Sequence, residues 1–300
     1  TTGNGQFLLT NEGIDCGSYT IDPPPHDYNY FLSQLHSVNQ YFENVSYGKF
    51  GIDLAQSSIY PSSLNGNYQL SNTMDFYNPY DDPLGQEEKL TKLFKDAIEQ
   101  SYGEDAIEFS KYDLVVVFHA GIGQDFSLPF LDPTPEDIPS TYIDEDMIQE
   151  HLGESHIIVG NHAIQKGIIL PETQNHLLYD ISETMFSDAE NPCEYQYGIT
   201  GTFSLMIGFA IGLPPLWNIQ TGESGVGVFG LMDQGSNNGR GIIPAPPTAW
   251  SRIYAGWENY VIGELGSEYH IPTRSENSII KVPIREDEYY LIESRSNWIK

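Results

Sequence analysis

Histidine and acidic side chains are the groups in this chain that could hold a catalytic metal. A zinc peptidase helix carries two histidines four residues apart with a glutamate beside the first, because residues at that spacing share one helix face. The chain has eight histidines. His151 and His156 are five residues apart, and His156 and His162 are six apart. Neither spacing is that of a helical zinc pair, so these histidines do not predict a catalytic zinc site.

Calcium is the metal that the acidic side chains favour, because calcium prefers clustered oxygen ligands. One cluster combines Asn78 with Asp81-Asp82, and another is the acidic run at residues 144–146. Neither cluster has the spacing of an EF-hand loop. The sequence therefore leaves a structural calcium ion open without naming its ligands.

Other catalytic signatures are missing from the sequence. The chain contains no Gly-x-Ser-x-Gly elbow and no phosphate-binding loop. The run Gly121-Ile122-Gly123-Gln124 is too short for a dinucleotide fingerprint. A serine triad could be composed from any chain of this length, so nothing here supports one.

The charge balance excludes two classes of partner. The chain has 42 acidic and 13 basic side chains, which gives a formal net charge of −29. Nucleic acids and anionic membranes need clustered Lys and Arg, so we expect no nucleic acid partner and no membrane insertion. A solvated acidic surface is the simplest interpretation of this charge.

Residues 201–217 are the most informative stretch. They read Gly-Thr-Phe-Ser-Leu-Met-Ile-Gly-Phe-Ala-Ile-Gly-Leu-Pro-Pro-Leu-Trp, which is apolar nearly all round, as in a helix buried on every side. A buried helix without catalytic ancestry fits this pattern. A transmembrane span fits it less well, because Thr200, Thr202, Ser204 and Pro214-Pro215 interrupt the roughly 20 apolar residues that a span needs.

This stretch resembles the zinc helix of the immune inhibitor A family of secreted metallopeptidases, whose motif reads His-Glu-Phe-Gly-His-x-x-Gly-Leu-Pro. The first His of the motif falls on Leu205, its Glu on Met206 and its second His on Phe209. The chain retains the motif's Gly208, Gly212, Leu213 and Pro214. Leu and Phe cannot ligate a metal, and Met206 cannot accept a proton, so the resemblance implies no catalytic residues, no metal ligands and no zinc. A following acidic position, a plausible third ligand, falls on Pro215.

Further blocks resemble the same family in the same order. They are residues 41–50, 112–121, 225–233, 247–257 and 289–295, and they span most of residues 38–297. The resemblance makes Met232 the methionine of the family's methionine turn, and we expect it to be a packing residue here. It also places His119 in a block that the family shares, which favours a structural role.

The resemblance implies an α+β, zincin-like metallopeptidase scaffold with a mixed sheet and a buried former active-site helix. We expect one peptidase-like domain over residues 1–300, either undivided or as two lobes over residues 1–198 and 199–300. The family is secreted, so we expect a secreted or cell-surface chain that is a piece of a longer multidomain protein. Secreted chains tend to pair their cysteines, and Cys16 and Cys193 could form one disulfide or stay as two thiols.

The hydrophobic pattern predicts the elements that position these blocks. Helices are expected at 29–44, 86–103, near 144–151, near 174–187, at 199–217 and near 247–254. Strands are expected within 46–60, at 114–118, 157–159 and 168–170, and near 258–263, 278–284 and 288–294. Residues 61–84 and 121–155 read as loops, apart from the short helix already named.

These observations favour an inactive metallopeptidase homologue, a pseudopeptidase, that acts in protein or peptide binding. A structural subunit of an extracellular layer or filament, acting by self-assembly, is the alternative. An active peptidase with an unorthodox site ranks last. The 20 tyrosines would suit a contact surface, although many could be partly buried.

Overall fold

The computed structural model describes residues 5–10, 16–17, 20–79, 82, 85–126, 135–175, 193 and 196–296. Its helices are α1 (Tyr28–Val45), α2 (Met74–Tyr77), α3 (Gln86–Asp105), α4 (Glu145–Leu152), α6 (Thr200–Ala210) and α7 (Ala249–Tyr254), with 3-10 turns at Phe109–Lys111, Gln124–Phe126, Gly227–Phe229 and Gln234–Asn237. Its strands are β1 (Val115–Ile122), β2 (Thr141–Ile143), β3 (Ile157–Val159), β4 (His162–Ile164), β5 (Gly167–Thr173), β6 (Tyr260–Ile262), β7 (Ile279–Pro283) and β8 (Tyr289–Ile292). The α+β class is confirmed.

The first helix begins and packs as its sequence predicts. The carboxylate of Asp27 accepts the backbone N–H groups of Asn29 and Tyr30 at 2.9 and 3.1 Å, which caps the first turn of α1. Val38 and Phe42, four residues apart, are fully buried. The helix therefore turns one apolar stripe toward the sheet and α6.

The central sheet has the strand order β1-β5-β2. β5 runs parallel to β1, with Ile169 opposite Val117, and antiparallel to β2, with Ile168 opposite Tyr142. Every residue of β5 is buried, which explains its continuous apolar run. β1 and β2 are the two edges of the sheet.

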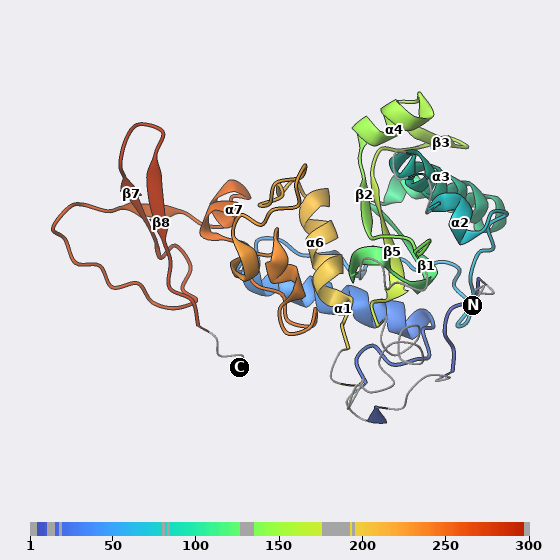
Figure 1. Cartoon of the computed structure of the whole chain (residues 1–300), viewed down its shortest axis with the longest axis horizontal. Coiled ribbons are helices and arrows are strands. Elements are labelled where there is room, and N and C mark those ends of the chain that lie inside the picture. The colour runs from blue at the N-terminus through green and yellow to red at the C-terminus, as the bar shows by residue number, and fades with distance from the viewer. Residues whose placement is uncertain are drawn as a thin grey trace.

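The sheet separates two hydrophobic cores, because successive side chains of β5 point to opposite faces. Ile169 packs with Phe94 of α3 on one face. Ile168 and Leu170 pack with Phe203 of α6, together with α1, on the other. Figure 1 shows α3 and α1 on different sides of this sheet, with α6 standing across α1.

A buried ionic network joins α7 to the last strand. Arg252 is buried; its Nε bonds to Glu258, and its Nη2 donates to Glu293 at 2.8 Å. Arg295 donates to the same Glu293 at 2.7 Å. Burial alone would raise the pKa of Glu293, but the hydrogen bond from Arg295 and the charge of Arg252 lower it. The network fixes the β6-β7-β8 sheet, which projects from the rest of the molecule in Figure 1.

The strand expected within residues 46–60 is wrong, since the segment forms turns instead. Ser46 Oγ accepts the N–H of Phe50 at 2.9 Å and donates to its carbonyl at 3.0 Å. The carboxylate of Asp53 accepts the N–H groups of Ala55 and Gln56. These short polar side chains bind the backbone locally and remove it from a strand ladder.

Other predictions are confirmed with shifted boundaries. The helix predicted over 199–217 ends at Ala210, and the short strands β2 and β4 and the helix α2 lie in segments that were not predicted to contain them. Most of the helix expected near 174–187 lies outside the described residues. Cys16 and Cys193 form a disulfide, which connects the N-terminal segment to the chain before α6.

Candidate functional site

Helix α6 is fixed at both ends by glycine. At its start, a β-carbon on Gly201 would lie 1.9 Å from the carbonyl oxygen of Ser236, so only glycine fits there. At its end, Gly212 has a φ of +88° and donates its N–H to Phe209 O at 2.9 Å. The N–H of Leu213 then bonds to Gly208 O at 2.9 Å. This is a Schellman termination, and it gives the Gly-Leu-Pro sequence a structural role that does not depend on a metal.

The three positions of α6 that align with the zinc motif are occupied by packed apolar side chains. Met206 is buried, with 8% of its surface exposed. Leu205 and Phe209 are half-buried and pack against the same core. Because they are four residues apart, they share the helix face that would carry two zinc ligands. No side chain at these positions can bind Zn²⁺ or act as a general base.

Aromatic rings surround Phe209 on this face. Its ring stacks on Tyr142 of β2, with centroids 6.3 Å apart and an interplanar angle of 21°. It also meets the edge of Trp217, with centroids 5.7 Å apart. All three rings are half-buried, so they form an aromatic surface between α6 and the sheet edge at β2. We refer to Tyr142, Phe209 and Trp217 as the aromatic cluster.

Met232 lies directly against the helix backbone. It is fully buried, and a β-carbon on Gly208 would lie 2.5 Å from its Sδ. Its carbonyl oxygen accepts the N–H of Leu216 at 2.8 Å. Met232 is therefore a packing residue beneath α6, as expected.

The loop that carries Met232 is anchored by the next residue. The Oδ2 atom of Asp233 accepts the hydroxyl of Ser224 and the N–H groups of Val226 and Gly227, each at 2.8 Å. Burial alone would raise the pKa of Asp233, but these donors and the N–H of Gln234 lower it. A charged carboxylate therefore ties the Gly-rich residues 224–227 to the turn that carries Met232. Sequence reasoning missed Asp233, although its place after Gly-Leu-Met in a glycine-rich segment is typical of a loop anchor.

The histidines considered in the sequence do not converge. His119 is bonded to the carbonyl oxygens of Ala120 and Ile138 at 3.0 and 3.1 Å, and burial lowers its pKa. His156 lies 2.7 Å from Gln165, and His162 contacts Ser110. His151 lies 3.5 Å from Glu87. Among the described residues, no group of three or more His, Cys, Asp or Glu could hold a metal ion.

A buried histidine outside these expectations joins the N-terminal segment to β5. His26 is fully buried, and its Nδ1 lies 2.7 Å from Glu172 Oε2. The other carboxylate oxygen of Glu172 accepts the N–H of Gly121 at 2.6 Å. No spacing rule pairs two residues so far apart in sequence, so this pair could not be predicted.

The two expected calcium clusters have local structural roles in this fold. The amide of Asn78 donates to Asp137 O at 2.6 Å and accepts from Gln86 at 2.7 Å. Asp81 lies outside the described residues. Asp144 caps α4 by accepting the N–H of Met147 at 2.9 Å. Calcium binding stays a prediction that these contacts do not test.

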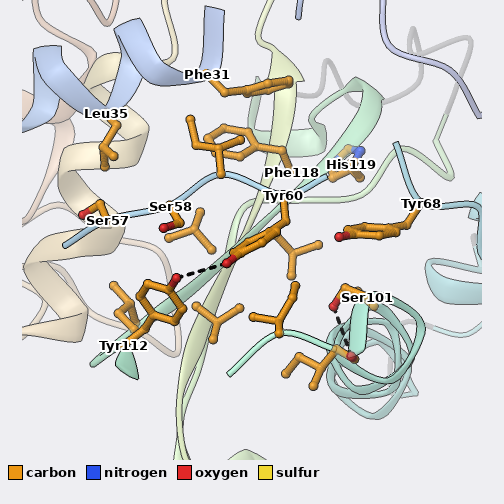
Figure 2. Close-up of a pocket in the computed structure, with 18 of the residues that line it drawn as sticks. Phe31, Leu35, Ser57, Ser58, Tyr60, Tyr68, Ser101, Tyr112, Phe118 and His119 are labelled. Carbon is orange, nitrogen blue, oxygen red and sulfur yellow. Dashed lines mark hydrogen bonds between the residues drawn. The ribbon is translucent and has the colours of Figure 1, made fainter. Parts of the chain in front are cut away.

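A cavity of about 610 Å³ lies on the far side of α6 from the aromatic cluster. Its apolar walls include Phe31, Phe118 and Phe203, from α1, β1 and α6. Figure 2 shows Tyr60 in the middle of the lining side chains, with its hydroxyl toward that of Tyr112, 3.3 Å away. The sequence did not predict this cavity, because it depends on how residues 50–61 cross the sheet edge.

No protein family model matches the chain, and no curated protein is significantly similar to it in sequence. The family resemblance is therefore carried by the motif residues and their order alone. In the part of the chain that the structure describes, no helix is both long and apolar enough to cross a membrane.

Proposed function

We propose that this chain is a catalytically inactive relative of the immune inhibitor A zinc peptidases, with a zincin-like scaffold, that binds a protein or peptide without cleaving it. The observation that carries this proposal is which residues α6 has at the positions of the zinc motif and how they pack. Leu205, Met206 and Phe209 replace the ligands and the base by packed apolar groups, while Gly208 and Gly212 keep the close packing and termination of the helix.

The aromatic cluster is the proposed contact surface. Tyr142 lies on β2, an edge strand that pairs only with β5 among the described strands. A free strand edge can add an extended peptide by main-chain hydrogen bonds. Phe209 and Trp217 then offer half-buried aromatic area beside that edge, which is typical of recognition surfaces.

The disulfide is consistent with the proposed secreted or cell-surface location. Cys16–Cys193 joins residues 177 positions apart, and disulfides persist in oxidising compartments. The formal charge of −29 favours partners that are neutral or cationic.

The test combines cleavage with capture on one peptide library. The purified chain is incubated with the library, and both bound and released peptides are identified by mass spectrometry. We expect retained peptides of unchanged length, with retention weakened by Phe209→Ala. Ile219→Ala, at an exposed position outside the cluster, is the matched control and should retain the same peptides. Chelator-sensitive cleavage would contradict the proposal.

A second candidate function, assembly into an extracellular layer or filament, is favoured by the β6-β7-β8 sheet. Val261 and Ile262 are each 50% exposed, Ile292 is 45% exposed and Tyr290 is 64% exposed. Exposed apolar side chains gathered on one small sheet are typical of an interaction surface. Concentration-dependent assembly in light scattering, lost in Ile262→Lys, would favour this function over the binding module.

A further inference from the structure

In the part of the chain that the structure describes, no strand pairs with the outer side of β1. β1 is an edge of the sheet and, among the described strands, pairs only with β5. In a parallel strand, alternate residues point their backbone N–H and C=O groups toward opposite neighbours. Half of the backbone groups of Val115–Phe118 therefore face away from β5. These residues are only half-buried, although they belong to an apolar run.

The cavity lies along this open edge. Its lining includes Val115, Val117 and Phe118 of β1, Leu35 of α1 and Ile207 of α6. Figure 2 shows Phe118 with Phe31 and Leu35 on one side, and Tyr60 and Tyr68 across from them. A volume of about 610 Å³ falls in the range of ligand pockets. The cavity therefore places apolar walls beside unpaired backbone groups.

The charges at the cavity decide which occupants it can accept. Lys166 already donates to Ala210 O at 2.8 Å, and Lys111 lies 2.7 Å from Glu108. The carboxylates of Asp53 and Asp113 also line the cavity, and Asp53 accepts the N–H groups of Ala55 and Gln56. The remaining polar groups in the lining are mostly hydroxyls and amides, including the Tyr60–Tyr112 pair. An anionic ligand such as a fatty acid would meet unfavourable charge in this acidic chain.

We propose that this cavity binds an extended, uncharged, apolar peptide segment that adds to β1 as a further strand of the sheet. A hydrocarbon would displace water from the edge of β1 and leave its backbone groups buried without partners, which is costly. A peptide strand supplies the matching donors and acceptors, while its side chains fill the apolar walls. The cavity thus offers unpaired backbone groups of β1 for the main chain of the peptide and apolar walls for its side chains.

This site is separate from the aromatic cluster and does not rest on the proposed function. The cavity is lined by Phe203 and Ile207 of α6, whereas Phe209 faces Tyr142 at the opposite edge of the sheet. Binding at β1 can therefore succeed or fail independently of binding at β2.

The experiment uses a pool of capped pentapeptides built from Val, Ile, Leu, Phe, Thr and Ser. Binders are isolated by ultrafiltration with the whole chain, and the best one is resynthesised in two forms, N-methylated at residues 1, 3 and 5 or at residues 2 and 4. We expect one form to lose affinity roughly tenfold or more, because its lost N–H donors are those that face β1. The other form should bind nearly as well as the parent peptide. Equal effects of both patterns, tighter binding of dodecanol than of any peptide, or no binder at all would overturn the proposal.

A variant locates the binding. Leu35→Trp fills the cavity and should lower the affinity of the best peptide about tenfold, whereas Ile219→Ala, at an exposed position outside the cavity, should change it less than about twofold. Amide hydrogen exchange of the wild-type chain is a second measurement that does not depend on whether Leu35→Trp folds. Alternate amides within Val115–Phe118 should gain protection when the peptide is added. Protection at Tyr142 instead would overturn the β1 site and would still support the proposed function at β2.

Discussion

The sulfur atom of Met232 fills the space that a β-carbon on Gly208 would need, since that carbon would lie 2.5 Å from Sδ. The helix that resembles a zinc helix therefore rests directly on the residue that resembles the family's methionine. Met232 is completely buried, and this contact is part of the core that covers it.

The change in unfolding free energy caused by a glycine-to-alanine substitution in a helix should depend on the atoms that the new methyl group contacts. Gly201→Ala places a β-carbon 1.9 Å from Ser236 O, a backbone atom that cannot rotate away, and should cost about 3 kcal/mol of unfolding free energy. Gly208→Ala meets the adaptable but buried Met232 and should cost about 1–2 kcal/mol. Urea denaturation measures both.

Gly103→Ala in α3 is the matched control. A β-carbon there meets nothing within 4 Å, so the higher helix propensity of alanine should stabilise the chain by up to about 1 kcal/mol. If Gly208→Ala behaved like this control, the close contact between α6 and Met232 would be wrong.

Introducing two histidines at the positions that align with the zinc motif should create a metal site. Leu205 and Phe209 share a half-buried helix face, so Leu205→His/Phe209→His presents two imidazoles at zinc-pair spacing. We expect zinc to raise the melting temperature of this double variant and to leave the wild type and Leu205→Ala/Phe209→Ala unchanged. A zinc-dependent shift in the wild type would show that another site binds the metal. No shift in the histidine variant would mean that these positions do not face one ligand space.

The sequence predicted most helices well because their signals are local. The apolar spacing within residues 29–44 and 86–103 predicts α1 and α3 within a few residues. The apolar run at 168–170 predicts β5, because a strand that is buried on both faces can carry apolar residues in succession instead of alternating them with polar ones. The prediction of a strand within residues 46–60 is wrong because the side chains of Ser46 and Asp53 bind the backbone there and hold it in turns, despite the apolar pattern.

Acid should destabilise the chain through Asp233. Its folded pKa is lowered from the usual 3.8, so its stabilisation is fully present above about pH 3.8 and is lost as the pH falls through the folded value. Asp233→Asn removes the charge that accepts five donors and should cost about 2 kcal/mol at pH 7. The difference in unfolding free energy between the two proteins should shrink below pH 4. A difference that is constant from pH 7 to pH 3 would contradict this role.

The disulfide should contribute measurably to stability. Cys16–Cys193 closes a loop of 177 residues, and cross-links that close long loops restrict the unfolded chain most. We expect Cys16→Ser/Cys193→Ser, or reduction of the wild type, to lower the melting temperature by about 5 °C or more. Calorimetry with and without reductant measures the effect, and an unchanged melting temperature would mean that the bridge constrains little.

The site could be predicted only in part. The apolar replacements at Leu205, Met206 and Phe209 are visible in the sequence because their helical spacing is fixed. The stack of Phe209 on Tyr142 is not visible, because it depends on β2 pairing with β5 at one register. The cavity beside β1 depends likewise on contacts between segments far apart in the chain.

The central claim is that α6 is a zinc helix without its zinc chemistry, and metal content tests it most directly. Elemental mass spectrometry of the purified chain, before and after dialysis against a chelator, gives the zinc bound per chain. The account predicts no stoichiometric zinc in either sample, whether or not calcium is found. One tightly held zinc ion per chain would contradict it and would require a metal centre outside Leu205, Met206 and Phe209.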